Sequence, residues 1–163
     1  MQYTIYPADI QHAQILNDIH YQSWIICYRG MLDDHFLDTM DPQRWVAFFQ
    51  KTLGTILEVE GKPAGCVTYK ISDELYGDQQ AGEIVSFYFL PSFWGKGVSS
   101  LLMQWVLNQL REMKCSIVSL WVLEQNKRAC RFYKKMGFSV TSESLYSKVG
   151  SQKTMDFRMI KAL

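Results

Sequence analysis

The stretch "FYFLPSFWGKGVSSLL", residues 87–102, decides the fold of this chain. A run rich in aromatic and β-branched residues stops at Pro91, and a helical pattern begins directly after Gly95 and Gly97. Glycine permits positive φ and a close approach to the backbone, and the first turn of a helix carries free N–H groups at the positive end of its dipole. The stretch therefore predicts a strand-to-helix turn that can seat an anion, most often a phosphate.

Two other glycine motifs for phosphate binding fit this turn poorly. A Walker P-loop needs glycine where Leu90 stands and serine or threonine directly after its lysine, whereas Gly97 follows Lys96. A dinucleotide fingerprint would need a third glycine in place of Ser100, and more than 80 residues precede this turn. Dinucleotide binding, with Glu124 as the acid that binds the ribose, stays a remote alternative. A further alternative is that the two glycines only shape a tight turn and bind no phosphate.

The elements around this turn alternate between strand and helix patterns. Leu101, Leu102, Trp105 and Leu110 are expected on the buried face of the helix that follows. This order predicts an α/β fold with a mixed sheet in a single domain over residues 1–163. Strands are expected at 2–8, 83–91 and 116–124 and in hairpins at 55–71 and 138–160; helices are expected from Asp9, around 36–40, from Asp41 to Phe49, at 97–112 and at 126–136.

The bulk composition is that of a soluble globular domain. The chain has 163 residues, 48% of them hydrophobic and 20% charged, with a formal net charge of +1. Near-neutral charge argues against a nucleic-acid partner, and no apolar run is long enough to cross a bilayer. Without a secretory signal, and with four scattered cysteines that form no C-x-x-C pair, the sequence predicts a cytoplasmic protein with reduced thiols.

A second motif stands in "WVLEQNKRACRFYKKMGF", residues 121–138, which carries N-x-x-A-x-x-F-Y-x-x-x-G-F. With "LPSFWGKGVSSLL" ahead of it, the chain resembles the GNAT superfamily of acyl-coenzyme A-dependent N-acetyltransferases over nearly its whole length. The resemblance implies a mostly antiparallel sheet flanked by helices. It also implies transfer of acetyl from acetyl-coenzyme A (acetyl-CoA) to an amine of a small molecule or protein, by direct attack in a ternary complex and without a metal.

The resemblance also implies which residues hold the coenzyme. The Q/R-x-x-G-x-G/A loop of the family falls on residues 94–99, although Trp94 replaces glutamine or arginine and Ser99 replaces the last glycine or alanine. The strand before the loop would bond the pantetheine arm with its backbone, although the rings of Phe87 and Phe89 themselves are expected in the core. The expected cofactor-binding residues are Phe87, Phe89, Trp94, Gly95, Lys96, Gly97, Val98, Ser99, Ser100, Asn126 and Tyr133.

Two residues match catalytic positions of the family. Tyr133 matches the acid that donates a proton to the coenzyme sulfur, and Glu83 matches a position where several members carry the base. Strand alternation predicts that Glu83 shares a face with Phe87 and Phe89. A solvated carboxylate at a strand end is an equal alternative for Glu83, and a water chain or His20 is then next in line as the base.

The acceptor side and the partners are less constrained. Trp24 and Tyr28 lie at i and i+4 on one helical face, where they either join the core or shape the acceptor pocket. A non-catalytic acyl-coenzyme A-binding regulatory module is the alternative function. Because homodimers are common in the family, the resemblance also allows a homodimer, although the sequence carries no interface signature.

Overall fold

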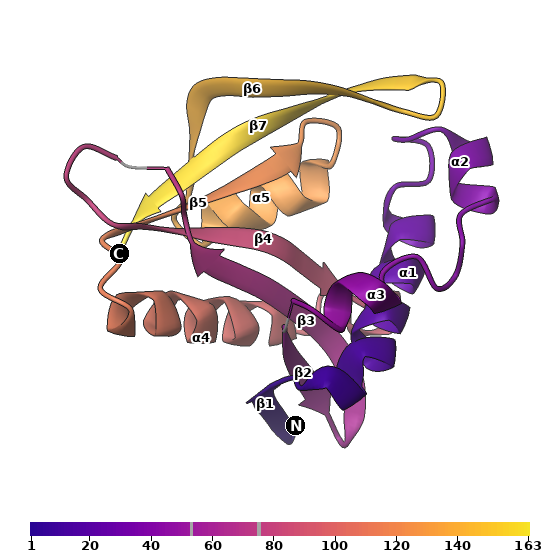
Figure 1. Cartoon of the computed structure of the whole chain (residues 1–163), viewed down its shortest axis with the longest axis horizontal. Coiled ribbons are helices and arrows are strands. Elements are labelled where there is room, and N and C mark those ends of the chain that lie inside the picture. The colour runs from indigo at the N-terminus through magenta and orange to yellow at the C-terminus, as the bar shows by residue number, and fades with distance from the viewer. Residues whose placement is uncertain (53, 75) are drawn as a thin grey trace.

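A computed structural model describes residues 1–52, 54–74 and 76–163 of the chain. Within these residues, seven strands form one sheet in the order β1-β2-β3-β4-β5-β7-β6. Only β4 and β5 are parallel, and all other neighbouring pairs are antiparallel (Figure 1). The strands are β1 (Tyr3–Pro7), β2 (Thr55–Val59), β3 (Lys62–Ile71), β4 (Ala81–Phe89), β5 (Ile117–Leu123), β6 (Ser139–Val149) and β7 (Gln152–Ala162).

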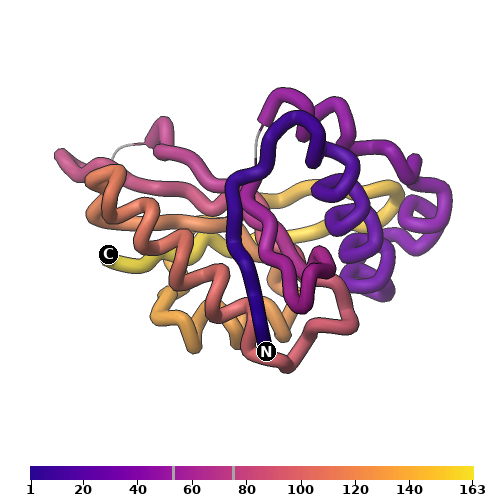
Figure 2. The backbone as a smooth tube through the Cα atoms, turned by 90° about the horizontal axis from the view of Figure 1, so that it is seen from below, coloured from indigo at the N-terminus to yellow at the C-terminus, as the bar shows by residue number. Residues whose placement is uncertain are grey.

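Helices cover both faces of the sheet. One core cluster joins α4 and α5 to one face, and a second joins α1 and α3 to the other; Figure 2 shows α1–α3 grouped at one end. The mixed, mostly antiparallel α/β architecture expected from the sequence is confirmed. The helices are η1 (Ile10–His12), α1 (Ala13–Cys27), α2 (Asp34–Asp38), α3 (Val46–Phe49), η2 (Pro91–Phe93), α4 (Val98–Glu112) and α5 (Lys127–Lys135).

Local signals set the ends of α5. The Asn126 side chain caps its N-terminus by accepting a hydrogen bond from the Ala129 N–H at 3.1 Å. Gly137 follows its C-terminus with φ of 90°, a conformation that glycine adopts without a steric penalty. The end of the helix before Gly137 was predicted from the sequence, whereas the capping role of the Asn126 side chain was not.

Two helix predictions were wrong in detail. On α4, Leu101 is exposed and Trp105 lies on the flank against Tyr69, because the fully buried stripe runs through Val98, Leu102, Val106 and Leu110. The helix expected from Asp41 spans only Val46–Phe49. Buried Asn17 binds the Pro42 carbonyl and the Trp45 N–H, and it thereby holds residues 42–45 in a turn.

No helix in the described part of the chain is both long and apolar enough to span a membrane.

Candidate active site

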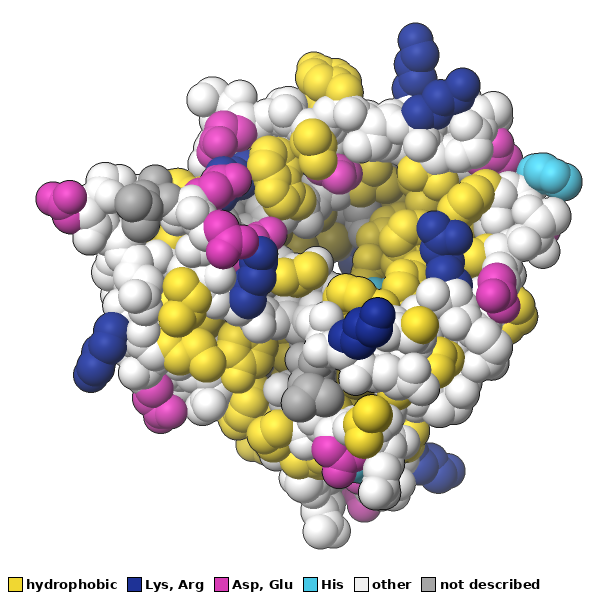
Figure 3. Space-filling model, viewed as in Figure 1, with side chains coloured by type: hydrophobic (Ala, Val, Ile, Leu, Met, Phe, Trp, Pro, Cys, Tyr) yellow, Lys and Arg dark blue, Asp and Glu magenta, His cyan; other side chains and the backbone are white. Residues whose placement is uncertain are grey.

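A cavity of about 700 Å³ opens where β4 and β5 separate. The two strands pair only from Ala81–Ile84 and Ile117–Leu120, although both continue further. Residues 85–89 and 121–123 therefore line the cavity without pairing to each other. Figure 3 shows a hollow rimmed by hydrophobic side chains on the face between the β6–β7 hairpin and α1–α3.

A β-bulge at Val85 changes which face of β4 each side chain uses. Thr68 of β3 pairs with Ser86 and Tyr69 pairs with Ile84, so Val85 is an extra residue on β4. Ile84, Phe87 and Phe89 consequently share the core face under α4 and α5.

The prediction that Glu83 shares a face with Phe87 and Phe89 was therefore wrong. Glu83 projects from the opposite side to Ile84, and its carboxylate lies 3.8 Å from the ammonium of Lys70. It is not among the cavity-lining residues of the described chain. The structure thus does not bring Glu83 to Tyr133.

The glycine turn forms one end of the cavity. Gly95 and Gly97 have φ of 72° and 79°, and a Cβ on either would point into open space. Gly97 is the N-cap of the fifteen-residue helix α4, whose first turn has no side-chain cap. The free N–H groups of that turn can therefore bind an anion.

The other loop residues divide between the cavity and the core. Trp94, Ser99 and Ser100 line the cavity, whereas the side chain of Val98 is buried in the core and that of Lys96 is exposed, its ammonium 5.5 Å from the ring centre of Phe93. The side chains of Lys96 and Val98 thus do not line the cavity.

Trp94 anchors the loop in a way that the sequence did not reveal. Its indole N–H donates to the Phe89 carbonyl at 2.8 Å, and the Arg128 guanidinium lies 3.2 Å from its ring centre. The Ser23 hydroxyl donates to the same carbonyl. Trp94 therefore ties the glycine turn to β4 and holds a cation beside the cavity.

Helix α5 supplies a polar and an aromatic wall. Arg128, Arg131 and Lys135 lie at i, i+3 and i+7 and line the cavity with exposed side chains. Asn126 is buried there, but its amide is already engaged with the Ala129 N–H and the Cys27 Sγ. Phe87 stacks on Phe132 of α5 with ring centres 5.6 Å apart, so its ring both packs in the core and lines the cavity.

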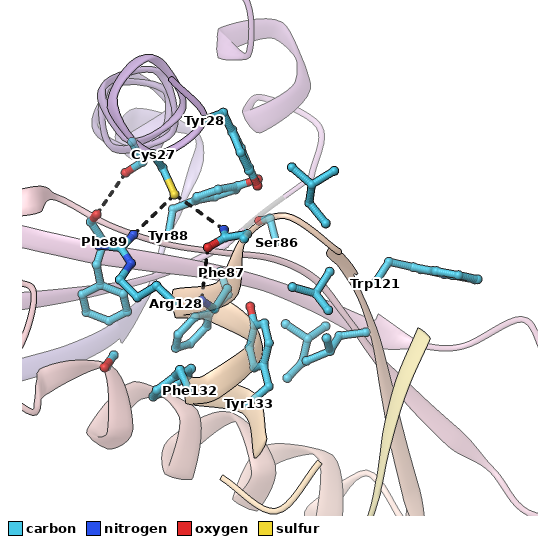
Figure 4. A pocket seen from close by; sticks show the side chains of 18 of the residues that line it. Cys27, Tyr28, Ser86, Phe87, Tyr88, Phe89, Trp121, Arg128, Phe132 and Tyr133 are labelled. Carbon is cyan, nitrogen blue, oxygen red and sulfur yellow. Dashed lines mark hydrogen bonds between the residues drawn. The ribbon is translucent and has the colours of Figure 1, made fainter. Parts of the chain in front are cut away.

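Tyr133 points from α5 into the middle of the cavity (Figure 4). The residue is 8% exposed, and its ring packs against Phe132 and Phe138. Burial, with smaller effects from Tyr88, Cys130 and Cys27, raises its pKa above the usual value. The phenol therefore keeps its proton at neutral pH and can donate it.

An aromatic group from α1 and β4 forms the opposite side. The Trp24 indole N–H donates to the Tyr88 hydroxyl at 3.0 Å, and the hydroxyls of Tyr28 and Tyr88 lie 3.1 Å apart. Trp24 and Tyr28 line the cavity and also pack on the small core cluster of Leu32, Leu37 and Leu123. Trp24 and Tyr28 thus both pack on a core cluster and line the cavity, and Tyr88 is a lining residue that the sequence analysis did not select.

His20 does not line this cavity, within the part of the chain that the structure describes. Its ring packs among Trp45, Phe49 and Tyr88, and burial lowers its pKa to about 3. An imidazole this weakly basic cannot readily take a proton from an ammonium. The structure therefore does not favour His20 as the base.

Comparison with known proteins identifies the family. The model of the acetyltransferase (GNAT) family matches residues 13–138, so this chain belongs to that family. An uncharacterized N-acetyltransferase of Archaeoglobus fulgidus is 28% identical over 114 residues, 68% of this chain and 78% of that protein. One in the pepI 3' region of Lactobacillus delbrueckii subsp. lactis is 26% identical over 157 residues, 86% of this chain and 90% of the relative.

Solved structures share the fold. The PaiA N-acetyltransferase of Thermoplasma acidophilum, in complex with coenzyme A, has a TM-score of 0.77 at 20% identity, with full coverage of both chains. YncA, a putative acetyltransferase of Salmonella typhimurium with acetyl-CoA, has a TM-score of 0.73 at 19% identity and covers 99% of this chain and 94% of its own. With the family match, these findings identify an N-acetyltransferase enzyme in place of a non-catalytic module or a dinucleotide-binding protein.

Proposed function

We propose that the protein transfers the acetyl group of acetyl-CoA to an amine by direct attack, with both substrates bound together. One observation carries the proposal: the glycine turn at the start of α4 and the hydroxyl-bearing Tyr133 line the same cavity. The coenzyme A of the PaiA structure and the acetyl-CoA of the YncA structure support it further.

The residues present fit a coenzyme. The open backbone at Gly95 and Gly97 leaves room for a pyrophosphate against the first turn of α4. The cationic side chains of α5 line the same cavity and could bind other phosphate oxygens of the coenzyme. Beyond Ile84, β4 does not pair with β5, so its backbone groups there could bond an extended chain.

Tyr133 is the residue to which we assign the acid. When the amine nitrogen attacks the thioester carbonyl, the carbon–sulfur bond breaks and the sulfur takes the electron pair. The phenol proton can pass to that sulfur, whose unperturbed pKa of about 8.5 also rises on burial. The proton that the nitrogen loses as the amide forms then restores the phenol, so that overall one proton moves from the amine to the sulfur. A buried hydroxyl that holds its proton suits this role.

The test is release of free thiol from acetyl-CoA in the presence of a set of primary amines. The proposal expects thiol release that depends on both substrates, with the acetylated amine identified by mass spectrometry. Tight binding of acetyl-CoA with no transfer to any amine would contradict it.

The cations of α5 give a prediction with a matched control. Arg131→Gln and Lys135→Gln should each weaken coenzyme A binding by up to about fivefold, because an exposed ion pair contributes about 0.2–1 kcal/mol. Lys134→Gln removes the same charge from the neighbouring position, which does not line the cavity, and should change little. Titration calorimetry at low and high salt measures the effect, which should shrink as salt screens the charges. Equal losses in all three variants would mean that only net charge matters.

The family resemblance and strand alternation suggested Glu83 as the catalytic base, and its place in the structure leads to the opposite prediction. Because its carboxylate lies beside Lys70 and outside the cavity lining, Glu83→Gln should leave the pH profile of kcat/KM unchanged in shape and height. The measurement compares both forms with one accepted amine between pH 6 and pH 9. A selective loss below about pH 8 in the variant would restore Glu83 as the base.

A further inference from the structure

Asp156 of β7 also lines the cavity. Its charge is opposite to that of the cations on α5, and it comes from a different element. It is half-buried, pairs with Leu123 at the end of β5, and is the one carboxylate among the cavity-lining residues of the described chain. Neither sequence motif includes it. The cavity therefore combines basic residues on α5 with a single acid on β7.

The carboxylate of Asp156 has no hydrogen-bond or ion-pair partner among the described residues. Burial is the sole cause of its raised pKa. The carboxylate of Asp33, at the start of α2, contrasts with it: Asp33 accepts hydrogen bonds from Ser151, His35 and Phe36, and these lower its pKa to about 2. A half-buried acid that no group of the described residues engages is free to bind a cationic ligand in the cavity.

The surrounding walls are aromatic and aliphatic. Trp24 and Tyr28 meet edge to face with ring centres 4.9 Å apart, and Figure 4 shows Trp121 on another side of the cavity from Tyr28. Leu32 and Val149 complete this compartment. The polar atoms of Trp24 and Tyr28 are already bonded to Tyr88, so these rings offer mainly their faces and edges.

A hydrogen-bonded contact joins two edges of the compartment. Asp33, the N-cap of α2, accepts from both the backbone N–H and the hydroxyl of Ser151 in the β6–β7 turn, each at 2.6 Å. In Figure 1 this turn reaches toward α2. The contact ties together the two segments that carry Leu32 and Val149, and it therefore helps to fix the positions of these two lining residues.

We propose that this compartment selects a primary amine that arrives as an ammonium on an apolar, preferably aromatic, body, and that Asp156 binds the ammonium. This inference rests on the proposed acetyl transfer and names the acceptor class. The carboxylate supplies the opposite charge, and nearby aromatic faces attract a cation and pack on an apolar body. Passage of one ammonium proton to the carboxylate would leave a neutral amine and a neutral carboxylic acid, so the nitrogen regains its lone pair while no unpaired charge is left in the compartment.

The experiment measures binding rather than turnover. Phenethylamine and 2-phenylethanol, which share an aromatic body but differ in charge, are titrated calorimetrically into the protein saturated with coenzyme A. We expect wild type to bind the amine at least about tenfold more tightly than the alcohol, as for a charge-assisted contact in a poorly solvated site. In Asp156→Asn the ratio should fall to near one.

Two control variants distinguish a specific loss of amine binding from a general disturbance of the protein. Asp156→Glu keeps the charge and should retain part of the preference, and Asp73→Asn removes an exposed carboxylate outside the cavity and should behave as wild type. Coenzyme A affinity should be the same in all forms. An amine preference that survives in Asp156→Asn, or a wild type that binds the amine no better than the alcohol, overturns the inference. Selective amine binding without thiol release would instead contradict the proposed acetyl transfer and leave the recognition by Asp156 standing.

Discussion

Tyr133→Phe is expected to lower kcat by about 10² to 10⁴-fold, the usual contribution of a positioned general acid. The ring contacts with Phe132 and Phe138 survive in the variant, and only the hydroxyl at the cavity is lost. Coenzyme A affinity and thermal stability should therefore stay close to those of wild type. Steady-state thiol release, with binding measured by calorimetry, checks both parts.

A matched variant distinguishes the loss of a proton donor from the loss of any buried hydroxyl. Tyr69→Phe removes a hydroxyl whose pKa burial also raises, on a side chain that packs against Trp105 and does not line the cavity. It should retain turnover within about threefold of wild type, because this hydroxyl lies outside the cavity and a typical hydrogen bond contributes only about 1 kcal/mol to stability. Wild-type turnover in Tyr133→Phe would remove Tyr133 from the chemistry.

Local sequence signals predicted the parts of the site that local structure builds. Asn126 and Gly137 bound α5 because capping depends on residues within one turn. Gly95 and Gly97 adopt positive φ ahead of α4 because the turn needs it, whatever lies elsewhere in the chain. Tyr133, by contrast, was selected through the resemblance to the family, because local signals alone allow a core aromatic residue on that helix.

The features that sequence reasoning missed depend on distant partners. The bulge at Val85 arises in the pairing of β4 with β3, and no residue in "EIVSFYFL" marks it. It moved Glu83 off the face where strict alternation had put it. Asp156 reaches the cavity only because β7 pairs with β5 and sets it beside Leu123. Asp156 is one of several charged residues in β7, and nothing in its local sequence indicated the cavity.

Trp94 departs from the family pattern and has a structural role. The motif expects a polar glutamine or arginine there, whereas the indole N–H donates to the Phe89 carbonyl within the protein. The guanidinium of Arg128, from α5, lies over the indole ring near the glycine turn. Sequence reasoning noted the lost polar contact at Trp94 but could not foresee these two contacts, because both partners are supplied by other elements.

Gly97→Val is expected to weaken acetyl-CoA binding by roughly 10- to 100-fold. A Cβ at Gly97 would enter open space, so no protein atom resists it, but φ of 79° strains any β-branched residue. Such a residue costs about 1–3 kcal/mol in that conformation, and relief of the strain would turn the first N–H groups of α4 away from the phosphate. The valine side chain would also occupy the space where the pyrophosphate approaches, and each tenfold in affinity corresponds to about 1.4 kcal/mol.

Gly61→Val is the matched control, because Gly61 has φ of 71° in the β2–β3 turn, with open space around its Cβ and no place in the cavity lining. Both variants should lose similar stability in thermal unfolding, since both carry the same backbone strain. Only Gly97→Val should lose coenzyme affinity in calorimetric titration of the folded protein. If the two variants bind acetyl-CoA equally well, the N-terminus of α4 does not seat the pyrophosphate, and the cations of α5 would have to hold the phosphates alone.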